Sequence, residues 1–125
     1  MSRINYLTLE EAVLIYNKVM ESTYSVPIVR DSATIEFVLE KVKELFNKEN
    51  GPLFWKAAFL IKEIVTKHPF LDGNKRAASA ITDGFLKLNG KNLKLAMEDV
   101  SFLEEIDSKR LKLKIVHEWL LRRAY

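Results

Sequence analysis

The sequence contains no cysteine, and it has only three prolines and four glycines among 125 residues. Without cysteine it can form no disulfide bond and offers no thiol nucleophile. It also has only two histidines, so a zinc site built from protein ligands would lack its usual donors. No apolar run approaches the ~18 residues of a membrane helix, and the first residues lack the apolar core of a signal peptide. We therefore expect a cytoplasmic protein with no membrane contact.

What the sequence does contain is typical of a globular helical protein. Hydrophobic residues make up 48% of the chain and charged residues 30%, and residues that interrupt helices are scarce. The length fits one domain. We find no internal repeat or linker, and we expect residues 1–125 to form a single domain.

The positive charge is concentrated at the end of the chain. The chain has 20 basic and 17 acidic residues, and residues 109–125 hold six of the basic and one of the acidic ones. Residues 1–108 therefore carry 14 basic and 16 acidic residues. The simpler interpretation is a solvated face of a last helix, and the alternative is a docking patch for an acidic partner or RNA. No aromatic residues alternate with these cations, as they would on a surface that stacks bases. Nucleic-acid binding is therefore not expected.

Apolar residues recur with helical spacing in four segments of the first 90 residues. Thr8 and Glu11 form a capping box that starts a helix reaching about Met20. Asp31 or Ser32 can cap a second helix that ends between Asn47 and Gly51, and Pro52 suits the first position of a third. A fourth helix is expected from about Asn74 until Asn89-Gly90, where glycine favours a stop.

The last third of the chain is less regular. Residues 91–97 could form a short strand through Leu93 and Leu95, and Glu98 or Asp99 can open a fifth helix that ends near Ile106. Ser108 can cap a sixth helix, whose inward face would comprise Leu111, Ile115, Val116, Trp119 and Leu120. The fold class is therefore all-α, with about six helices around a central hairpin of the third and fourth helices.

The loop of that hairpin carries the most distinctive stretch, His68-Pro69-Phe70-Leu71-Asp72-Gly73-Asn74-Lys75-Arg76. Pro69 should end the third helix, because a residue before proline avoids the helical region. Gly73 permits a tight turn, after which Asn74 and Lys75 would present free N–H groups at the start of a helix. Such a cradle holds phosphate oxygens, and the side chains of Lys75 and Arg76 add two cations.

Two further side chains of the loop suggest chemistry. The carboxylate of Asp72 is a hard oxygen ligand that suits Mg²⁺ bound to phosphates. His68 can accept a proton from an attacking hydroxyl group. Each residue alone has a plainer interpretation as a helix cap, a turn or a surface pair. Together they supply a base, a metal ligand and an anion cradle, as phosphoryl or nucleotidyl transfer requires. The other histidine, His117, is interpreted as structural.

The loop resembles the signature of the Fic/Doc (Fido) family, His-Pro-Phe-x-Asp/Glu-Gly-Asn-Gly-Arg-x-x-Arg. The chain departs from it at two positions: Lys75 replaces the second glycine and Ser79 replaces the second arginine. The lysine is the pattern of the Doc branch, the death-on-curing toxins. The Leu7-Thr8-x-Glu10-Glu11 start, Arg30-Asp31 and the Leu86-x-x-Asn89-Gly90 segment are also Doc-like.

The resemblance implies a Fido fold and the use of ATP with Mg²⁺. In Doc the reaction is transfer of the γ-phosphate to a threonine of a translation elongation factor, whereas Fic enzymes usually transfer AMP to a protein hydroxyl. His68 and Asp72 would then be catalytic, Asp72 would also bind the metal, and Gly73, Asn74, Lys75 and Arg76 would bind the nucleotide phosphates. The resemblance also implies a target-docking flap at residues 21–30 and a separate antitoxin protein.

We favour kinase activity, because Lys75 would occupy space that the α-phosphate needs when the nucleotide binds in the orientation used by Fic enzymes. AMP transfer, and a Fido module that binds but has little or no catalytic activity, remain as alternatives.

Overall fold

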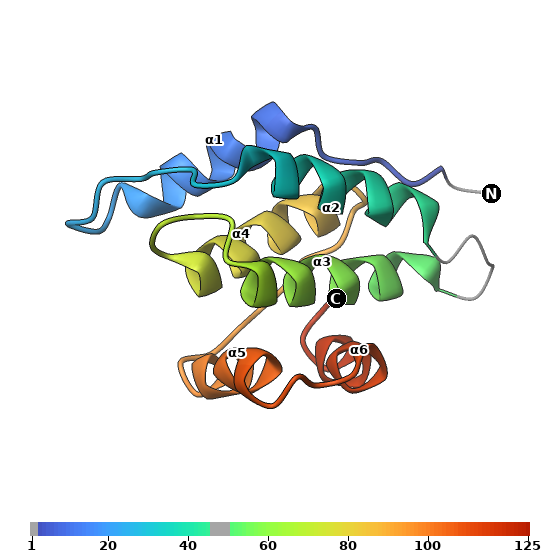
Figure 1. Ribbon diagram of the computed structural model, residues 1–125. Helices are drawn as coiled ribbons and strands as arrows, with labels where there is room; N and C mark the ends of the chain where they lie inside the picture. Colours follow the sequence, from blue (N-terminus) through green and yellow to red (C-terminus); the bar gives the residue numbers. More distant parts are fainter. Residues whose placement is uncertain (1–2, 46–50) are drawn as a thin grey trace.

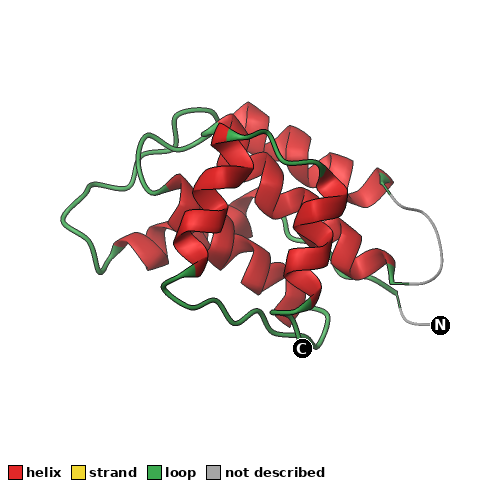
Figure 2. Cartoon of the chain, turned by 90° about the horizontal axis from the view of Figure 1, so that it is seen from below, coloured by secondary structure: helices red, strands yellow, loops and turns green. Residues whose placement is uncertain are grey.

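The computed structural model describes residues 3–45 and 51–125, and these residues form six helices (Figure 1). The helices are α1 (Leu9–Met20), α2 (Ser32–Glu44), α3 (Pro52–Lys67), α4 (Asn74–Lys87), α5 (Asp99–Ser108) and α6 (Leu113–Leu121). Figure 2 shows only helices and loops in this part of the chain. The all-α prediction is therefore confirmed. None of the helices in the described ranges is long and apolar enough to cross a membrane.

The starts of the first two helices follow from their capping residues. The Thr8 hydroxyl accepts the N–H of Glu11 at 3.1 Å, and the Glu11 carboxylate accepts the N–H of Thr8 at 2.8 Å, which completes the predicted capping box. Asp31 caps α2 by accepting the N–H of Thr34 at 3.0 Å. The helix ends at Glu44, because Leu45 is extended (φ −80°, ψ 148°), so it stops earlier than the predicted end between Asn47 and Gly51. Residues 46–50 lie outside the described part.

Helices α3 and α4 form the central hairpin. In Figure 1, α1 and α2 lie on one side of α3, and α5 and α6 lie on the other. Small side chains allow α3 and α4 to pack closely, and Ala57, Ala58, Ala77 and Ala78 are completely buried. The other helices cover α3 on several sides, and both α3 and α4 contribute buried residues to the core. The loop between them is therefore fixed at both of its ends.

The C-terminal third corrects two predictions. Ser108 does not cap α6: it is the last residue of α5, and α6 begins at Leu113 after a Lys112 cap that makes no side-chain hydrogen bond. Arg110 adopts a left-handed conformation (φ 49°). Residues 109–112, which the sequence predicts to be the start of the sixth helix, therefore form the turn between α5 and α6. This shift leaves Ile115 44% exposed instead of inward-facing, whereas Val116, Trp119 and Leu120 are buried as predicted.

Residues 91–97 form no regular strand, but they pair with the end of the chain. Leu93 and Ala124 make a single antiparallel bridge. Asn92 and Tyr125 exchange two backbone hydrogen bonds of 2.7 and 2.9 Å, and the N–H of Lys94 donates to the carbonyl of Arg123 at 2.9 Å. We call this pairing of residues 92–94 with 123–125 the C-terminal clasp. It holds α5 and α6 together as a layer beneath α3.

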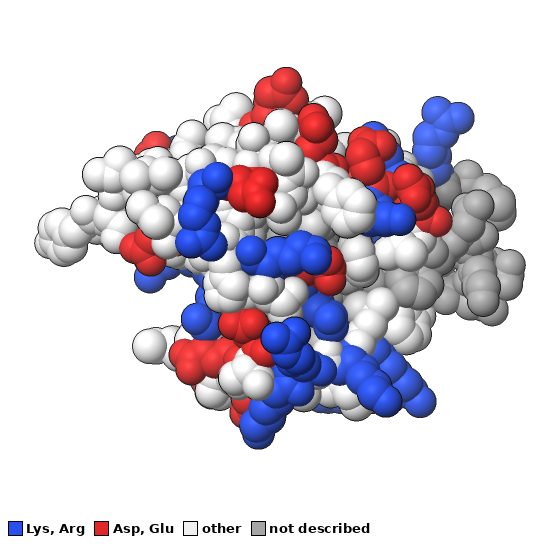
Figure 3. Space-filling model, in the orientation of Figure 1, with Lys and Arg blue, Asp and Glu red and all other residues white. Residues whose placement is uncertain are grey.

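The basic residues of the tail lie mainly on this layer. In Figure 3, Lys and Arg side chains gather over α6 and the turn before it, next to acidic side chains of α5. One of them, Lys109, pairs with Glu105 at 3.4 Å along α5. Exposed pairs of this kind are typical of a solvated helix face.

Candidate active site

The α3–α4 loop is closed by one side chain, the amide of Asn74. Its Oδ1 atom accepts the N–H of Phe70 at 3.0 Å, and its Nδ2 atom donates to the carbonyl of Phe70 at 2.9 Å. His68, just before Pro69, leaves the helix in a left-handed conformation (φ 51°, ψ 55°). The chain therefore turns sharply after α3 and is held in that turn by the first residue of α4.

Tyr16 of α1 anchors the α3–α4 loop through its contacts with Phe70 and Asp72. Phe70 is completely buried, and its ring stacks on that of Tyr16 with 3.9 Å between the centroids. The Tyr16 hydroxyl donates to the carbonyl of Asp72 at 2.8 Å and accepts the N–H of Ile28 at 3.3 Å. Tyr16 is a buried residue of α1, and the polar contacts of its hydroxyl join two loops that are distant in sequence.

The flap, defined here as residues 21–30, lies against the loop. Val29 and Phe70 form an antiparallel bridge, and the N–H of Leu71 donates to the carbonyl of Ile28 at 3.0 Å. The Arg30 guanidinium donates to the carbonyl of His68. Arg30 thus holds the loop backbone at the end of α3.

The start of α4 is open to an anion. Gly73 has φ 76°, and no side chain caps the helix, so the N–H groups of Asn74, Lys75 and Arg76 have no partner within the helix. The first intrahelical bond there runs from the N–H of Ala77 to the carbonyl of Gly73 at 2.7 Å. Three N–H groups at the positive end of the helix dipole suit a phosphate group.

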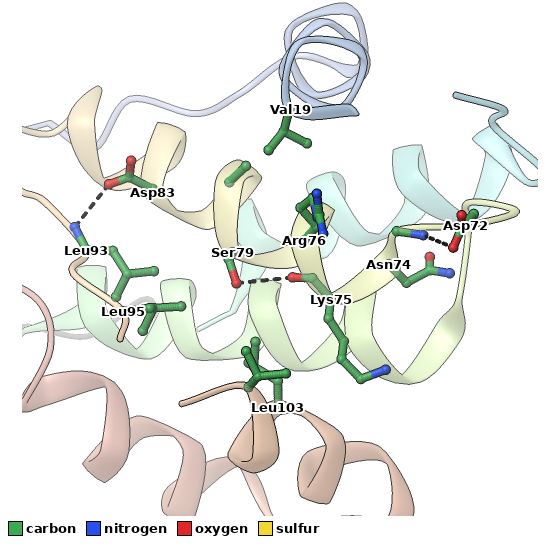
Figure 4. Close-up of a pocket in the computed structure, with 13 residues that line it drawn as sticks. Val19, Asp72, Asn74, Lys75, Arg76, Ser79, Asp83, Leu93, Leu95 and Leu103 are labelled. Carbon is green, nitrogen blue, oxygen red and sulfur yellow. Dashed lines mark hydrogen bonds between the residues drawn. The ribbon is translucent and has the colours of Figure 1, made fainter. Parts of the chain in front are cut away.

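A cleft of about 600 Å³ begins at this helix start and runs along α4 (Figure 4). Its polar end contains the predicted residues Asp72, Gly73, Asn74, Lys75 and Arg76. Lys75 extends toward α5, and Arg76 extends toward Val19 of α1, so the two cations reach opposite sides of the first turn. The far end is mostly apolar, with walls formed by Leu93, Leu95, Val100 and Leu103, and Asp83 beside Leu93 is its one acidic side chain among the described lining residues.

Asp72 carries the negative charge of the polar end. Its Oδ2 atom accepts the Ser25 hydroxyl of the flap at 2.6 Å, and its Oδ1 atom accepts the N–H of Gly73 at 2.8 Å. The Ser25 hydrogen bond, followed by that from Gly73, lowers the pKa of Asp72 below its ordinary value. The carboxylate is therefore charged at neutral pH.

The residues present fit a Mg²⁺ ion that is shared with phosphates. Within residues 3–45 and 51–125, no group of three or more His, Cys, Asp or Glu side chains could hold a metal ion. A single charged carboxylate beside an anion cradle is nevertheless the arrangement in which Mg²⁺ takes its other ligands from phosphate and water. Asp72 is the residue that would hold the ion.

The side chain of His68 is not among those that line the cleft, and it contacts a residue that the sequence did not indicate. Its Nε2 atom is 2.9 Å from Oδ2 of Asp107 on α5, and both side chains are 42% exposed. The two residues are 39 positions apart, and no spacing rule links them. His117, in contrast, stacks on Trp55 with 3.7 Å between the centroids, and burial lowers its pKa. These contacts agree with a structural role for His117.

Comparison with known families agrees with this geometry. The model of the Fic/DOC family matches residues 6–86, from the residues just before α1 to nearly the end of α4. The chain belongs to the Fic/DOC family. Proteins of this family share the all-α Fido fold, generally transfer phosphate or nucleotide groups to proteins, and use ATP, typically with Mg²⁺. A search of the curated proteins gave no match to the chain.

Proposed function

We propose that this Fic/DOC protein is a Doc-like toxin that transfers the γ-phosphate of ATP to a Ser or Thr hydroxyl of a translation elongation factor. The observation that carries the proposal is the first turn of α4. Three N–H groups without intrahelical partners and the side chains of Lys75 and Arg76 meet there, at the mouth of a cleft of about 600 Å³. Phosphoryl transfer depends mainly on positioning and charge stabilisation, which such a site supplies.

The identity of residues 75 and 79 favours the γ-phosphate over the α-phosphate. Lys75 extends into the cleft from the position where Fic enzymes have glycine, and its side chain takes space beside the cradle. Ser79 stands where Fic enzymes have a second arginine, and its hydroxyl turns back to the carbonyl of Lys75 at 3.1 Å. The cleft therefore lacks the second arginine at position 79, and the Fic orientation of the nucleotide loses both its space and its clamp.

The residues of the loop divide the chemistry between them. His68 takes the proton of the target hydroxyl, whose oxygen then bonds to the γ-phosphorus while the bond to the β–γ bridging oxygen breaks and ADP leaves. The N–H groups of Asn74 to Arg76, with the side chains of Lys75 and Arg76, bind the phosphates. Asp72 would hold Mg²⁺, which when bound would neutralise part of the phosphate charge.

A second groove suits an antitoxin protein, which a toxin of this kind is expected to have as its partner. It has a volume of about 460 Å³ and lies between α1 and α4. Its walls include Leu14, Ile15, Val19, Ala80 and Gly84, and Leu14 is 68% exposed. An amphipathic helix of the antitoxin would place its apolar face in such a groove.

A labelling experiment tests the reaction. The purified protein is incubated with a cell extract, Mg²⁺ and ATP labelled at either the α- or the γ-phosphate, with His68→Ala as the inactive control. We expect a protein band labelled from γ-labelled ATP only, and none with His68→Ala. Label from α-labelled ATP would instead establish AMP transfer, and an absence of label from both would favour a module that binds without catalysis.

A further inference from the structure

We propose that Asp107 of α5 is a positioning residue for His68, fixing the ring nitrogen that carries hydrogen and stabilising the ring when it gains a proton. The inference rests on the proposed function, in which His68 is the base. It adds a residue outside the signature loop, and outside the matched residues 6–86, to the catalytic machinery.

The backbone of His68 is held on both sides, and its ring contacts Asp107. The N–H of His68 donates to the carbonyl of Ile64 at 3.2 Å, and the carbonyl of His68 accepts the Arg30 guanidinium. With the backbone fixed on both sides, the ring meets Asp107 with 2.9 Å between Nε2 and Oδ2. A contact of this length is a full hydrogen bond.

The chemistry of this contact determines the tautomer. An ionised carboxylate only accepts hydrogen bonds, so Nε2 of the neutral ring must carry the hydrogen and Nδ1 must keep the lone pair. A histidine base works only if the nitrogen that faces the hydroxyl is unprotonated, and a second group usually enforces this state. Asp107 would also stabilise the positive charge that the ring gains on taking the proton.

The position of Asp107 on its helix is not explained by helix stability. Asp107 lies in the last turn of α5, which has no basic residue, and a carboxylate is unfavourable near the negative end of a helix dipole. Leu103 and Ile106 are buried and dock the helix against the core. The docked helix thus places the Asp107 carboxylate beside His68. The contact with His68 can offset the unfavourable interaction of this carboxylate with the dipole of α5.

The test measures the tautomer directly, on protein with ¹⁵N-labelled histidine. In the intact protein the ring nitrogen shifts of neutral His68 should show hydrogen on Nε2 almost exclusively, and in Asp107→Ala the population with hydrogen on Nδ1 should rise toward that of a free histidine side chain. Asp107→Asn, which keeps an acceptor but no charge, should lie between the two. A tautomer population in Asp107→Ala equal to that of the intact protein would overturn the proposal, whether or not the protein transfers label.

Kinetics supply a second readout. With γ-labelled ATP, Asp107→Ala should lower kcat about tenfold or more, a part of the gain that a general base provides, and leave KM for ATP within about twofold, because the phosphate cradle is unchanged. Asp107→Glu should recover part of the rate. Glu104→Ala, an exposed acid on the same helix, is the matched control and should behave like the intact protein. A rate in Asp107→Ala equal to or above that of the intact protein would show that Asp107 blocks the base instead, and would overturn the proposal.

Discussion

Position 73 shows how one residue without a side chain sets the geometry of the anion cradle. Gly73 has φ 76°, and an added Cβ would lie 2.6 Å from the sulfur of Met20 and 3.1 Å from its methyl carbon. Gly90 has the same φ of 76°, but nothing lies within 4 Å of its Cβ position. The two positions therefore separate backbone strain from steric conflict.

We predict that Gly73→Ala destabilises the protein more than Gly90→Ala does. Both variants should lose about 1–2 kcal/mol from the left-handed backbone, and Gly73→Ala should lose about 1–3 kcal/mol more from overpacking against Met20. Urea unfolding of the two variants measures the difference. Equal losses would show that Met20 moves aside without cost.

Lys56 is a charged residue in the core, where it completes the end of another helix. The side chain is 3% exposed. Its ammonium donates to the carbonyls of Val42 at 2.7 Å, Lys43 at 3.3 Å and Leu45 at 2.5 Å. Val42 and Lys43 lie in the last turn of α2 and Leu45 is its C-cap, and carbonyls at such a helix end have no partner within the helix.

We expect Lys56→Met to keep the packing volume but to leave these carbonyls unsatisfied. The cost should be about 1–3 kcal/mol in the free energy of unfolding. Lys62→Met, a half-buried lysine of the same helix, is the control and should cost less. If both variants unfold at the same urea concentration, water must replace the ammonium at the end of α2.

At the scale of elements, the flap and the α3–α4 loop behave as one unit. Residues 28–31 bond to the backbone of residues 69–71, and Ser25 bonds to the carboxylate of Asp72 at 2.6 Å. The hydroxyl of Ser25 occupies an oxygen that a metal ion would use. Binding of the ion and contact of the flap are therefore expected to compete.

We predict that Ser25→Ala lowers the Mg²⁺ concentration needed for half-maximal binding of a non-hydrolysable ATP analogue. Loss of one hydrogen bond of about 0.5–1.5 kcal/mol corresponds to a change of about two- to tenfold. Ser22→Ala is the matched control, because the Ser22 hydroxyl only donates to the carbonyl of Val19 at 3.3 Å. Unchanged Mg²⁺ dependence in Ser25→Ala would contradict the competition.

The sequence predicted what depends on neighbours along the chain. The caps at Thr8 and Asp31 and Pro52 at the start of α3 follow from local rules, and the structure places each as expected. Residues 72–76 lie together at the cleft, and their binding of phosphate stays a prediction. Ser25 and Asp107 were missed because their contacts span 47 and 39 positions. The start of α6 was misplaced because the left-handed turn at Arg110 has no glycine to signal it.

At the scale of the whole molecule, an ion pair joins α5 to the end of the chain. Asp99 accepts the Arg123 guanidinium at 2.7 Å, and the Asp99 side chain is only 7% exposed. Burial raises the pKa of Asp99, but the N–H of Ala96 and the Arg123 guanidinium outweigh burial and bring the pKa below its ordinary value of 3.8. The pair therefore stabilises the folded protein when Asp99 is ionised.

We predict that Asp99→Asn lowers stability at neutral pH and that this deficit shrinks in acid. Because the folded-state pKa is depressed, the stabilisation is fully present above pH 3.8 and is lost as the pH falls through the lower folded-state pKa. Urea unfolding of both proteins between neutral pH and about pH 2 measures the change. A deficit that stays constant over this range would show that the charge of Asp99 contributes nothing.

The C-terminal clasp has a consequence for how this protein can be controlled. Residues 123–125 bond to residues 92–94 and so close the segment that carries α5. The same helix presents Asp107 to His68. A partner that captures Tyr125 and separates residues 123–125 from residues 92–94 would therefore act on the proposed catalytic base from a distance, without entering the cleft.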